Sequence, residues 1–231
     1  MKNLKQLTLD LCLGDRANFA NFFAGNNEQV VQALTSLCME ESPFFIYFWG
    51  KSGSGKSHLL AALCQLFYEK GLSTAYLPLE DHDKLDPRLL DDLENLDLIC
   101  IDGLHLIAGD LKWEEKIFHC FNNMLAHKRK VVVAANIAPH ILPLKLLDLK
   151  SRMTGGLTFS LQDLDDGAKL SSLKMRAKLR GLELSDSVAG FLLRHYKRDT
   201  KSLFVLLEKL DKAALRDQRR LTIPFVKDIL G

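Results

Sequence analysis

A glycine-rich segment that ends in lysine and serine is the feature of this sequence with the clearest chemistry. Residues 50–57 match G-x-x-x-x-G-K-S at every fixed position, between an apolar run and a helix-like stretch. Glycines let the backbone curl so that its N–H groups face phosphate oxygens, the lysine meets the outer phosphates, and the serine can ligate Mg²⁺. A plain glycine turn is the alternative, which the complete match disfavours. The predicted phosphate-binding residues are Gly50, Lys51, Ser52, Gly53, Ser54, Gly55, Lys56, Ser57 and His58.

An acidic residue at the end of a buried run predicts the metal side of the same site. Asp102 closes the apolar run 97–102 and is the candidate Mg²⁺ partner through water, together with Ser57. Hydrolytic P-loop proteins carry a second carboxylate next to this position to activate water, but here the next residue is Gly103. We therefore expect weak or no intrinsic ATP hydrolysis and a mostly diphosphate-bound protein. His105 is either a substitute base or, as we favour, a histidine at a helix start or in the core.

Two further polar residues follow elements that belong beside a nucleotide. Asn136 comes directly after the apolar run 131–135, where it can contact a γ-phosphate or water, although an ordinary strand-to-loop asparagine explains it equally well. Arg152 precedes the last β-rich run, in a position from which it can reach the nucleotide of a neighbouring subunit. A solvated or ion-paired surface arginine is the alternative.

The elements that must carry these residues are visible in the hydrophobic pattern. Five short β-rich runs alternate with helix-like stretches, which favours a parallel α/β sheet. The expected strands are 44–49, 74–78, 98–101, 131–135 and 157–161, and the clearest helices between them are 57–70 and 113–128.

After residue 163 the strand signals stop and four helical segments follow, 165–180, 185–196, 201–217 and 222–230. Asp165, Ser185 and Thr222 are good N-caps, and Pro224 falls in a first helical turn. We expect three parts: an extended tail (1–18), an α/β nucleotide-binding core (19–162) and a helical lid domain (163–231).

Composition narrows the function classes. The chain has 231 residues with 47% hydrophobic and 26% charged positions and a formal net charge of +2. That charge is too balanced for a self-sufficient DNA binder held by phosphate contacts. No apolar stretch approaches a membrane span and no signal segment opens the chain, so we expect a cytoplasmic protein without membrane contacts. Five separated cysteines with no Cys-x-x-Cys argue against a disulfide framework and a zinc knuckle.

The order of these motifs resembles the AAA+ ATPase domain of the replication initiator DnaA. The phosphate loop, the Ile101-Asp102-Gly103 segment, Asn136, Ser151-Arg152 and the helical lid occur in the family's order. Residues 19–27 are similar to the segment that contributes to the family's adenine pocket. Within the family, the chain is similar to the regulatory inactivators of DnaA. That finer resemblance is carried by residues 100–110, 178–184 and 221–230.

The resemblance implies roles for particular residues. Arg152 corresponds to an arginine finger presented in trans to ATP held by DnaA, where a guanidinium is worth ~10³–10⁵ in rate. Lys201 stands where the family's lid sensor is an arginine, so it keeps the charge but loses the bidentate fork. The N-terminal segment resembles a Q-L-x-L-x-L motif for docking on the polymerase sliding clamp; a first strand or a frayed end is the alternative. The clamp-binding residues would be Gln6, Leu7, Leu9 and Leu11.

The implied function is negative control of replication initiation. Holding ADP or ATP with Mg²⁺ and docked on the DNA-loaded clamp, the protein would stimulate hydrolysis of DnaA-bound ATP and reach DNA only indirectly. The alternative is a self-assembling replication ATPase such as a helicase loader, against which Gly103 counts. A P-loop kinase fits poorly because the helices follow the sheet. Nucleotide-dependent self-association is a further hypothesis. From the chain length we also expect that the helix-turn-helix domain that follows the lid in DnaA is absent.

Overall fold

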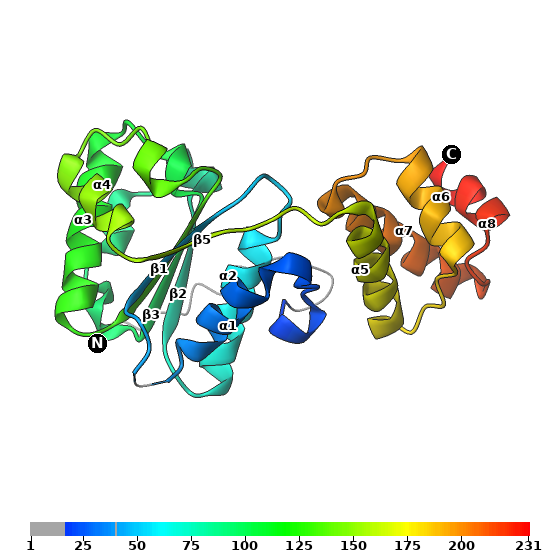
Figure 1. Cartoon of the computed structure of the whole chain (residues 1–231), viewed down its shortest axis with the longest axis horizontal. Helices are drawn as coiled ribbons and strands as arrows, with labels where there is room; N and C mark the ends of the chain where they lie inside the picture. The colour runs from blue at the N-terminus through cyan, green and yellow to red at the C-terminus, as the bar shows by residue number, and fades with distance from the viewer. Residues whose placement is uncertain (1–16, 40) are drawn as a thin grey trace. The chain divides into compact units, whose positions relative to one another are not determined.

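The computed structural model describes residues 17–39 and 41–231. The predicted clamp-docking residues Gln6, Leu7, Leu9 and Leu11 lie outside this part of the chain. The described residues form two compact units (Figure 1). The first comprises residues 17–19 and 27–162 apart from residue 40, and the second comprises residues 20–26 and 163–231. The segment 20–26, which the sequence placed with the core, thus groups with the C-terminal helices.

The first unit is built on a five-stranded sheet in the order β2-β3-β4-β1-β5, and each pair of neighbours is parallel. This confirms the parallel α/β sheet, and the strand bounds lie within a residue of those expected. The strands are β1 (Phe45–Trp49), β2 (Thr74–Pro78), β3 (Leu98–Asp102), β4 (Lys130–Ala135) and β5 (Leu157–Ser160).

Helices cover both faces of the sheet, because the central strands are apolar on both sides. Side chains such as Tyr47, Ile101 and Val133 pack with α3 and α4 in one core, while α2 packs on the opposite face with α1 beside it (Figure 1). The helices are α1 (Glu28–Ser36), α2 (Lys56–Glu69), α3 (Leu111–Ala126) and α4 (Leu147–Thr154). The helices α1 and α4 and the short 3₁₀ helices between β2 and β3 were not predicted from the sequence.

The strand register brings the predicted nucleotide-binding residues to one edge of the sheet. Trp49 at the end of β1 pairs with Ala135, and Asp102 at the end of β3 pairs with Ala134. The phosphate loop, Gly103 and Asn136 therefore all follow strands that end at the same level. This carboxyl edge is where open α/β sheets bind ligands.

The second unit is a group of four helices with its own hydrophobic core, centred on buried leucines such as Leu173, Leu192 and Leu207. Three predicted N-caps are confirmed, since side-chain oxygens of Asp165, Ser185 and Thr222 accept backbone N–H bonds from Ala168, Val188 and Phe225. The helices are α5 (Asp166–Leu179), α6 (Asp186–His195), α7 (Thr200–Asp217) and α8 (Ile223–Leu230), with Pro224 in the first turn of α8.

Cys38, Cys64, Cys100 and Cys120 are free thiols in the described part of the chain. Within the same residues, none of the helices has the length and apolar character needed to cross a membrane.

Candidate nucleotide-binding site

The phosphate loop joins β1 to α2, and its shape depends on glycine. Gly53 and Gly55 have φ angles of +81° and +95°, which lie in the left-handed region that favours glycine. A Cβ on Gly50 would lie 2.9 Å from Leu161 Cβ and 2.8 Å from Ser54 Oγ. The loop therefore closes tightly at its base, and α2 begins directly after it at Lys56.

The Lys56 side chain crosses the inside of this loop. It is 7% exposed, and its ammonium donates hydrogen bonds of 2.8 Å to the carbonyl oxygens of Gly50 and Lys51. Ser54 Oγ is buried there without a hydrogen-bond partner among the described residues. The phosphate cradle thus consists of the buried Lys56 ammonium, the Ser54 hydroxyl without a partner and the N-terminus of the 14-residue helix α2. All three provide positive potential or hydrogen-bond donors. These features fit the phosphates of a nucleotide.

Asp102 is held in place by a tyrosine that the sequence analysis did not identify. The Tyr76 hydroxyl donates a 2.8 Å hydrogen bond to Asp102 Oδ2. Burial and the neighbouring charge of Asp102 raise the pKa of Tyr76, while a hydrogen bond with Ser57 opposes that shift. Tyr76 thus holds one of the two predicted Mg²⁺ ligands, Asp102, and lies near the other, Ser57.

The donor set at this edge suits Mg²⁺ held jointly with a nucleotide. One hydroxyl (Ser57) and one carboxylate (Asp102) are hard oxygen ligands, and among the described residues no cluster of three histidine, cysteine or acidic side chains could hold a metal by itself. Mg²⁺ commonly keeps several waters and takes its other ligands from phosphates. Ser57 and Asp102 would therefore hold the ion beside bound phosphates, where it would neutralise phosphate charge.

His105 joins the end of β3 to the end of β4. The backbone N–H of Asn136 donates to His105 Nδ1 at 3.3 Å, so Nδ1 is an acceptor and the ring proton resides on Nε2. Burial and the charge of Lys56 lower the pKa of His105, against the opposing effect of Asp102. The ring is thus placed to donate a hydrogen bond from Nε2, not to remove a proton from water there. The geometry does not favour His105 as a substitute base.

Gly103 occupies a turn that resists a side chain. Its φ is +83°, its N–H donates to Ala134 O at 2.9 Å, and an added Cβ would lie 2.9 Å from Leu106 Cδ1. A carboxylate residue at this position would adopt a strained backbone. The backbone conformation at this position therefore explains why no water-activating carboxylate follows Asp102.

Two other predicted residues lie at the rim of the site. The His58 ring, on α2, donates from Nε2 to the carbonyl oxygen of Asn18 at 3.1 Å, so it contacts the segment before α1. Asn136 is exposed immediately after β4, between the strands that carry the phosphate loop and Asp102. Its position fits the predicted role, which remains a prediction.

Arg152 lies on α4, about a hundred positions along the sequence from the residues of the phosphate cradle. It is exposed, and its guanidinium has no ion-pair or hydrogen-bond partner within residues 17–39 and 41–231, whereas Leu149 and Met153 on the same helix are completely buried. Arg152 therefore projects outward from a helix that is fixed on its other side. Lys201 is an exposed residue in the first turn of α7 and belongs to the second unit. Its predicted contact with phosphate stays a prediction.

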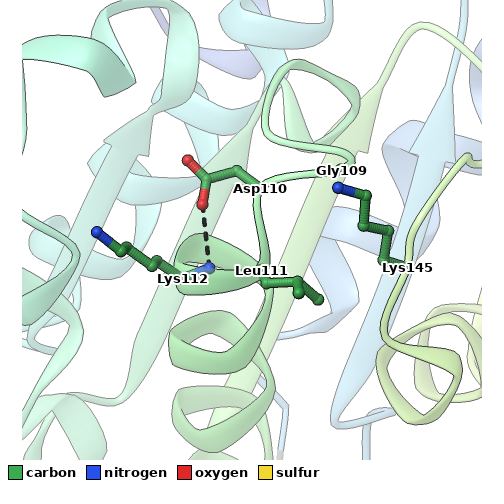
Figure 2. Close-up of a pocket in the computed structure, with 5 residues that line it drawn as sticks. All are labelled: Gly109, Asp110, Leu111, Lys112 and Lys145. Atoms are coloured by element: carbon green, nitrogen blue, oxygen red, sulfur yellow. Dashed lines mark hydrogen bonds between the residues drawn. The ribbon is translucent and has the colours of Figure 1, made fainter.

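A surface pocket of about 590 Å³ opens between the start of α3 and the segment before α4 (Figure 2). It is lined by Gly109, Asp110, Leu111, Lys112 and Lys145, and Asp110 caps the helix by accepting the N–H of Lys112. No residue of the phosphate loop lines it. The pocket is therefore not the nucleotide site.

The fold is that of a P-loop protein of the AAA+ class. It combines a parallel sheet in this strand order, a phosphate loop before α2, an acidic residue that ends β3 and a following group of helices. Comparisons with known families agree. Residues 13–160 match the bacterial DnaA ATPase domain, and residues 165–230 match the lid domain of Hda. The chain belongs to the bacterial DnaA ATPase-domain family and is an Hda-like member of it.

Solved structures share the fold. Domain III of the replication initiation protein DnaA from Thermotoga maritima is similar with a TM-score of 0.77 at 20% identity, covering 92% of this chain and 96% of that chain. AMPPCP-bound DnaA from Aquifex aeolicus gives 0.70 at 22% identity over 89% and 70% of the two chains. The RuvB Holliday junction branch migration motor of Thermotoga maritima gives 0.65 at 15% identity over 89% and 67%.

Proposed function

We propose that this protein is a nucleotide-bound negative regulator of replication initiation that stimulates hydrolysis of ATP bound to DnaA. The observation that carries the proposal is the match of residues 165–230 to the Hda lid domain, joined in one chain to a DnaA-type ATPase domain. The first match supports a regulator over an initiator, and the second supplies the shared AAA+ architecture. The proposed partner is DnaA itself.

The site supports a regulator that holds nucleotide more than it consumes it. Lys56, Ser54 and the start of α2 form the phosphate cradle, and Ser57 and Asp102 supply ligands for Mg²⁺. Gly103 offers no carboxylate, and Nδ1 of His105 is occupied by an N–H donor. ADP is the nucleotide we propose, because it accumulates in a protein whose hydrolysis, although slow, is faster than its release of product. AMPPCP-bound DnaA of similar fold makes adenine the expected base.

Arg152 is the group that acts on the partner. An exposed guanidinium without an ion-pair partner in the described part of the chain is available to a phosphate on another protein. At a γ-phosphate it would stabilise the charge that develops as the phosphoryl group leaves, which is worth ~10³–10⁵ in rate in other systems. The proposal thus assigns the hydrolytic water and its activation to DnaA and the extra cation to this protein.

Docking on the sliding clamp completes the proposal. The segment with Gln6, Leu7, Leu9 and Leu11 would place alternate apolar side chains in a groove of the clamp. Tethering two partners on the same DNA-loaded ring raises their effective concentration without new contacts between them. Contact with DNA is then indirect, which suits a net charge of +2.

The deciding experiment mixes the purified chain with ATP-loaded DnaA and DNA-loaded clamp and follows conversion of ATP to ADP. We expect strong stimulation that is lost in Arg152→Ala and in the double variant Gln6→Ala with Leu7→Ala. Lys150 is half-buried and too close to Arg152 to serve as a control, so exposed Lys70→Ala at the far end of α2 is the matched charge removal and should remain active. Hydrolysis that depends on neither set of residues would overturn the mechanism. Rapid ATP turnover by the chain alone would instead favour a self-assembling ATPase.

A further inference from the structure

Helix α4, which carries Arg152, needs tertiary contacts to fix its position. It spans eight residues, too few for an independently stable helix. Leu149 and Met153, four residues apart, are completely buried and determine which side of the helix faces the core. They leave Arg152 on the exposed side. Packing of two apolar side chains does not by itself define where the helix begins.

A buried glutamate on α3 contacts the N-cap residue of α4. Glu114 is completely buried, and its Oε2 accepts the backbone N–H of Leu146 at 2.7 Å. Leu146 is the N-cap of α4, and its carbonyl oxygen accepts the N–H of Lys150 at 3.1 Å. The residue at which α4 starts is therefore hydrogen-bonded to α3 on one side and to its own helix on the other.

The second oxygen of Glu114 joins two more segments. Its Oε1 accepts the N–H of Lys145 at 3.2 Å and the N–H of Gly109 at 2.6 Å. Gly109 ends the segment that follows Asp102, so one carboxylate connects the loop after the predicted metal ligand to the start of α4. Gly109 and Lys145 both line the surface pocket in Figure 2.

The chemistry of this arrangement requires an acceptor with several lone pairs. Three backbone N–H groups converge on one side chain, and a buried carboxylate is tolerated because these donors replace its water. An apolar residue of similar size would leave all three N–H groups unpaired. Glutamine would retain one oxygen but turn an NH₂ group toward N–H donors. The three N–H groups, and not packing, therefore require a carboxylate at this position.

We propose that Glu114 is a positioning residue: it fixes the start of α4 and thereby the direction in which Arg152 projects toward the partner's nucleotide. The proposal rests on the proposed function for the role of Arg152, whereas the anchoring of α4 by Glu114 is independent of it. The two parts are therefore measured separately.

The anchoring is tested by amide hydrogen exchange of the full chain, comparing the wild type with Glu114→Gln. We expect the amides of Lys145 and Leu146 to exchange at least tenfold faster in the variant, while amides in the middle of β4 keep their protection. Glu115→Gln is the matched control, because Glu115 is the exposed neighbour on the same helix and should change neither. Unchanged exchange at Lys145 and Leu146 in folded Glu114→Gln would overturn the proposal.

The consequence for Arg152 is tested in the DnaA hydrolysis assay. We expect Glu114→Gln to lower the maximal stimulated rate at least fivefold, with its half-saturating concentration and its affinity for ADP within twofold of the wild type. A variant that merely lost folded protein would shift the half-saturating concentration and would lose ADP-binding capacity. Glu114→Gln combined with Arg152→Ala should be no worse than Arg152→Ala, because Glu114 acts through Arg152.

The outcomes separate the two proposals. A fully active Glu114→Gln beside an inactive Arg152→Ala would refute Glu114 as a positioning residue and leave the proposed function intact. A fully active Arg152→Ala would refute the proposed finger, and amide exchange would still decide on the anchor. Should Glu114→Gln fail to fold, Glu114→Asp takes its place, since it keeps the carboxylate but withdraws it by one methylene. The same exchange and rate changes, smaller in size, are then expected, and their absence overturns the proposal.

Discussion

The hydroxyl of Tyr76 donates a 2.8 Å hydrogen bond to Oδ2 of Asp102, the acidic residue that ends β3. The two residues belong to adjacent strands, with Tyr76 paired to Cys100 two positions before Asp102, so the long phenol reaches along the sheet to the carboxylate. A donor on Oδ2 leaves Oδ1 and its lone pairs for water or a metal. Tyr76 thus orients the carboxylate that we expect to face Mg²⁺.

Replacement of Tyr76 by phenylalanine removes this donor while it retains the buried ring. A hydrogen bond to a charged group contributes about 1.5–3 kcal/mol, and the part that serves metal binding should appear as a roughly tenfold loss of ADP affinity in the presence of Mg²⁺. Affinity measured with a chelator should hardly change, because Lys56 and the loop hold the phosphates without Tyr76. Isothermal titration of ADP under both conditions makes the comparison.

Tyr68→Phe is the control for this substitution, since Tyr68 is 61% exposed on α2. It should behave as the wild type in both titrations. An equal loss of affinity for Tyr76→Phe with and without Mg²⁺ would mean that the tyrosine supports the loop and not the metal ligand.

Gly103→Ala should destabilise the protein through its backbone. A left-handed φ of +83° costs an L side chain about 1–2 kcal/mol, and the nearest atom, Leu106 Cδ1, belongs to an exposed side chain that can move aside. Gly71→Ala, with φ of +74° and open space around it, should lose a similar amount. Gly155→Ala, at φ of −85°, should be neutral or slightly stabilising. Urea unfolding of the three variants tests this order, and an unaffected Gly103→Ala would remove our account of the missing carboxylate.

The sequence predicted the parts of this site whose chemistry is local. The phosphate loop could be predicted from spacing because the roles expected of its glycines, Lys56 and Ser57 involve only adjacent backbone and a following helix. The caps Asp165, Ser185 and Thr222 were identifiable for the same reason, since each accepts an N–H three residues along. Residues that interact with near neighbours in the chain can be recognised from sequence spacing.

Residues whose partners lie far along the chain left no such pattern. Tyr76 reaches Asp102 over 26 positions, and Glu114 reaches the amides of Lys145 and Leu146 over 31 and 32. A tyrosine in a strand and a glutamate in a helix are unremarkable by type, and only the register of β2 on β3 and the packing of α3 on α4 give them a role. The one sequence signal for the role of Glu114 was its place among the apolar residues of the predicted helix 113–128. An acidic side chain buried there needs hydrogen-bond partners.

His105 predicts a specific dependence of stability on pH. Its pKa is lowered in the folded protein by burial and by Lys56, so below its ordinary value of 6.5 the unfolded chain binds a proton that the folded chain does not. The free energy of unfolding therefore falls as pH drops through 6.5. His105→Gln removes this titration. Between pH 7.5 and 5.5 its free energy of unfolding, measured with urea, should therefore fall by less than that of the wild type. A variant with an equal or steeper loss would show that His105 is not held neutral by its surroundings.

Lys56→Ala tests whether the cradle binds nucleotide at all. The ammonium lies inside the loop on Gly50 O and Lys51 O, so its removal takes the only buried lysine of the described chain from the place where phosphates fit. At a hundred times its dissociation constant, Mg-ADP should stabilise the wild type by about 2.7 kcal/mol. A hundredfold weaker variant at the same ADP concentration should gain only about 0.4 kcal/mol. Lys70→Ala, an exposed lysine at the other end of α2, should gain the full amount. Because each comparison is the difference between one variant with and without ADP, any change in basal stability cancels, and an undiminished gain in Lys56→Ala would place the nucleotide elsewhere.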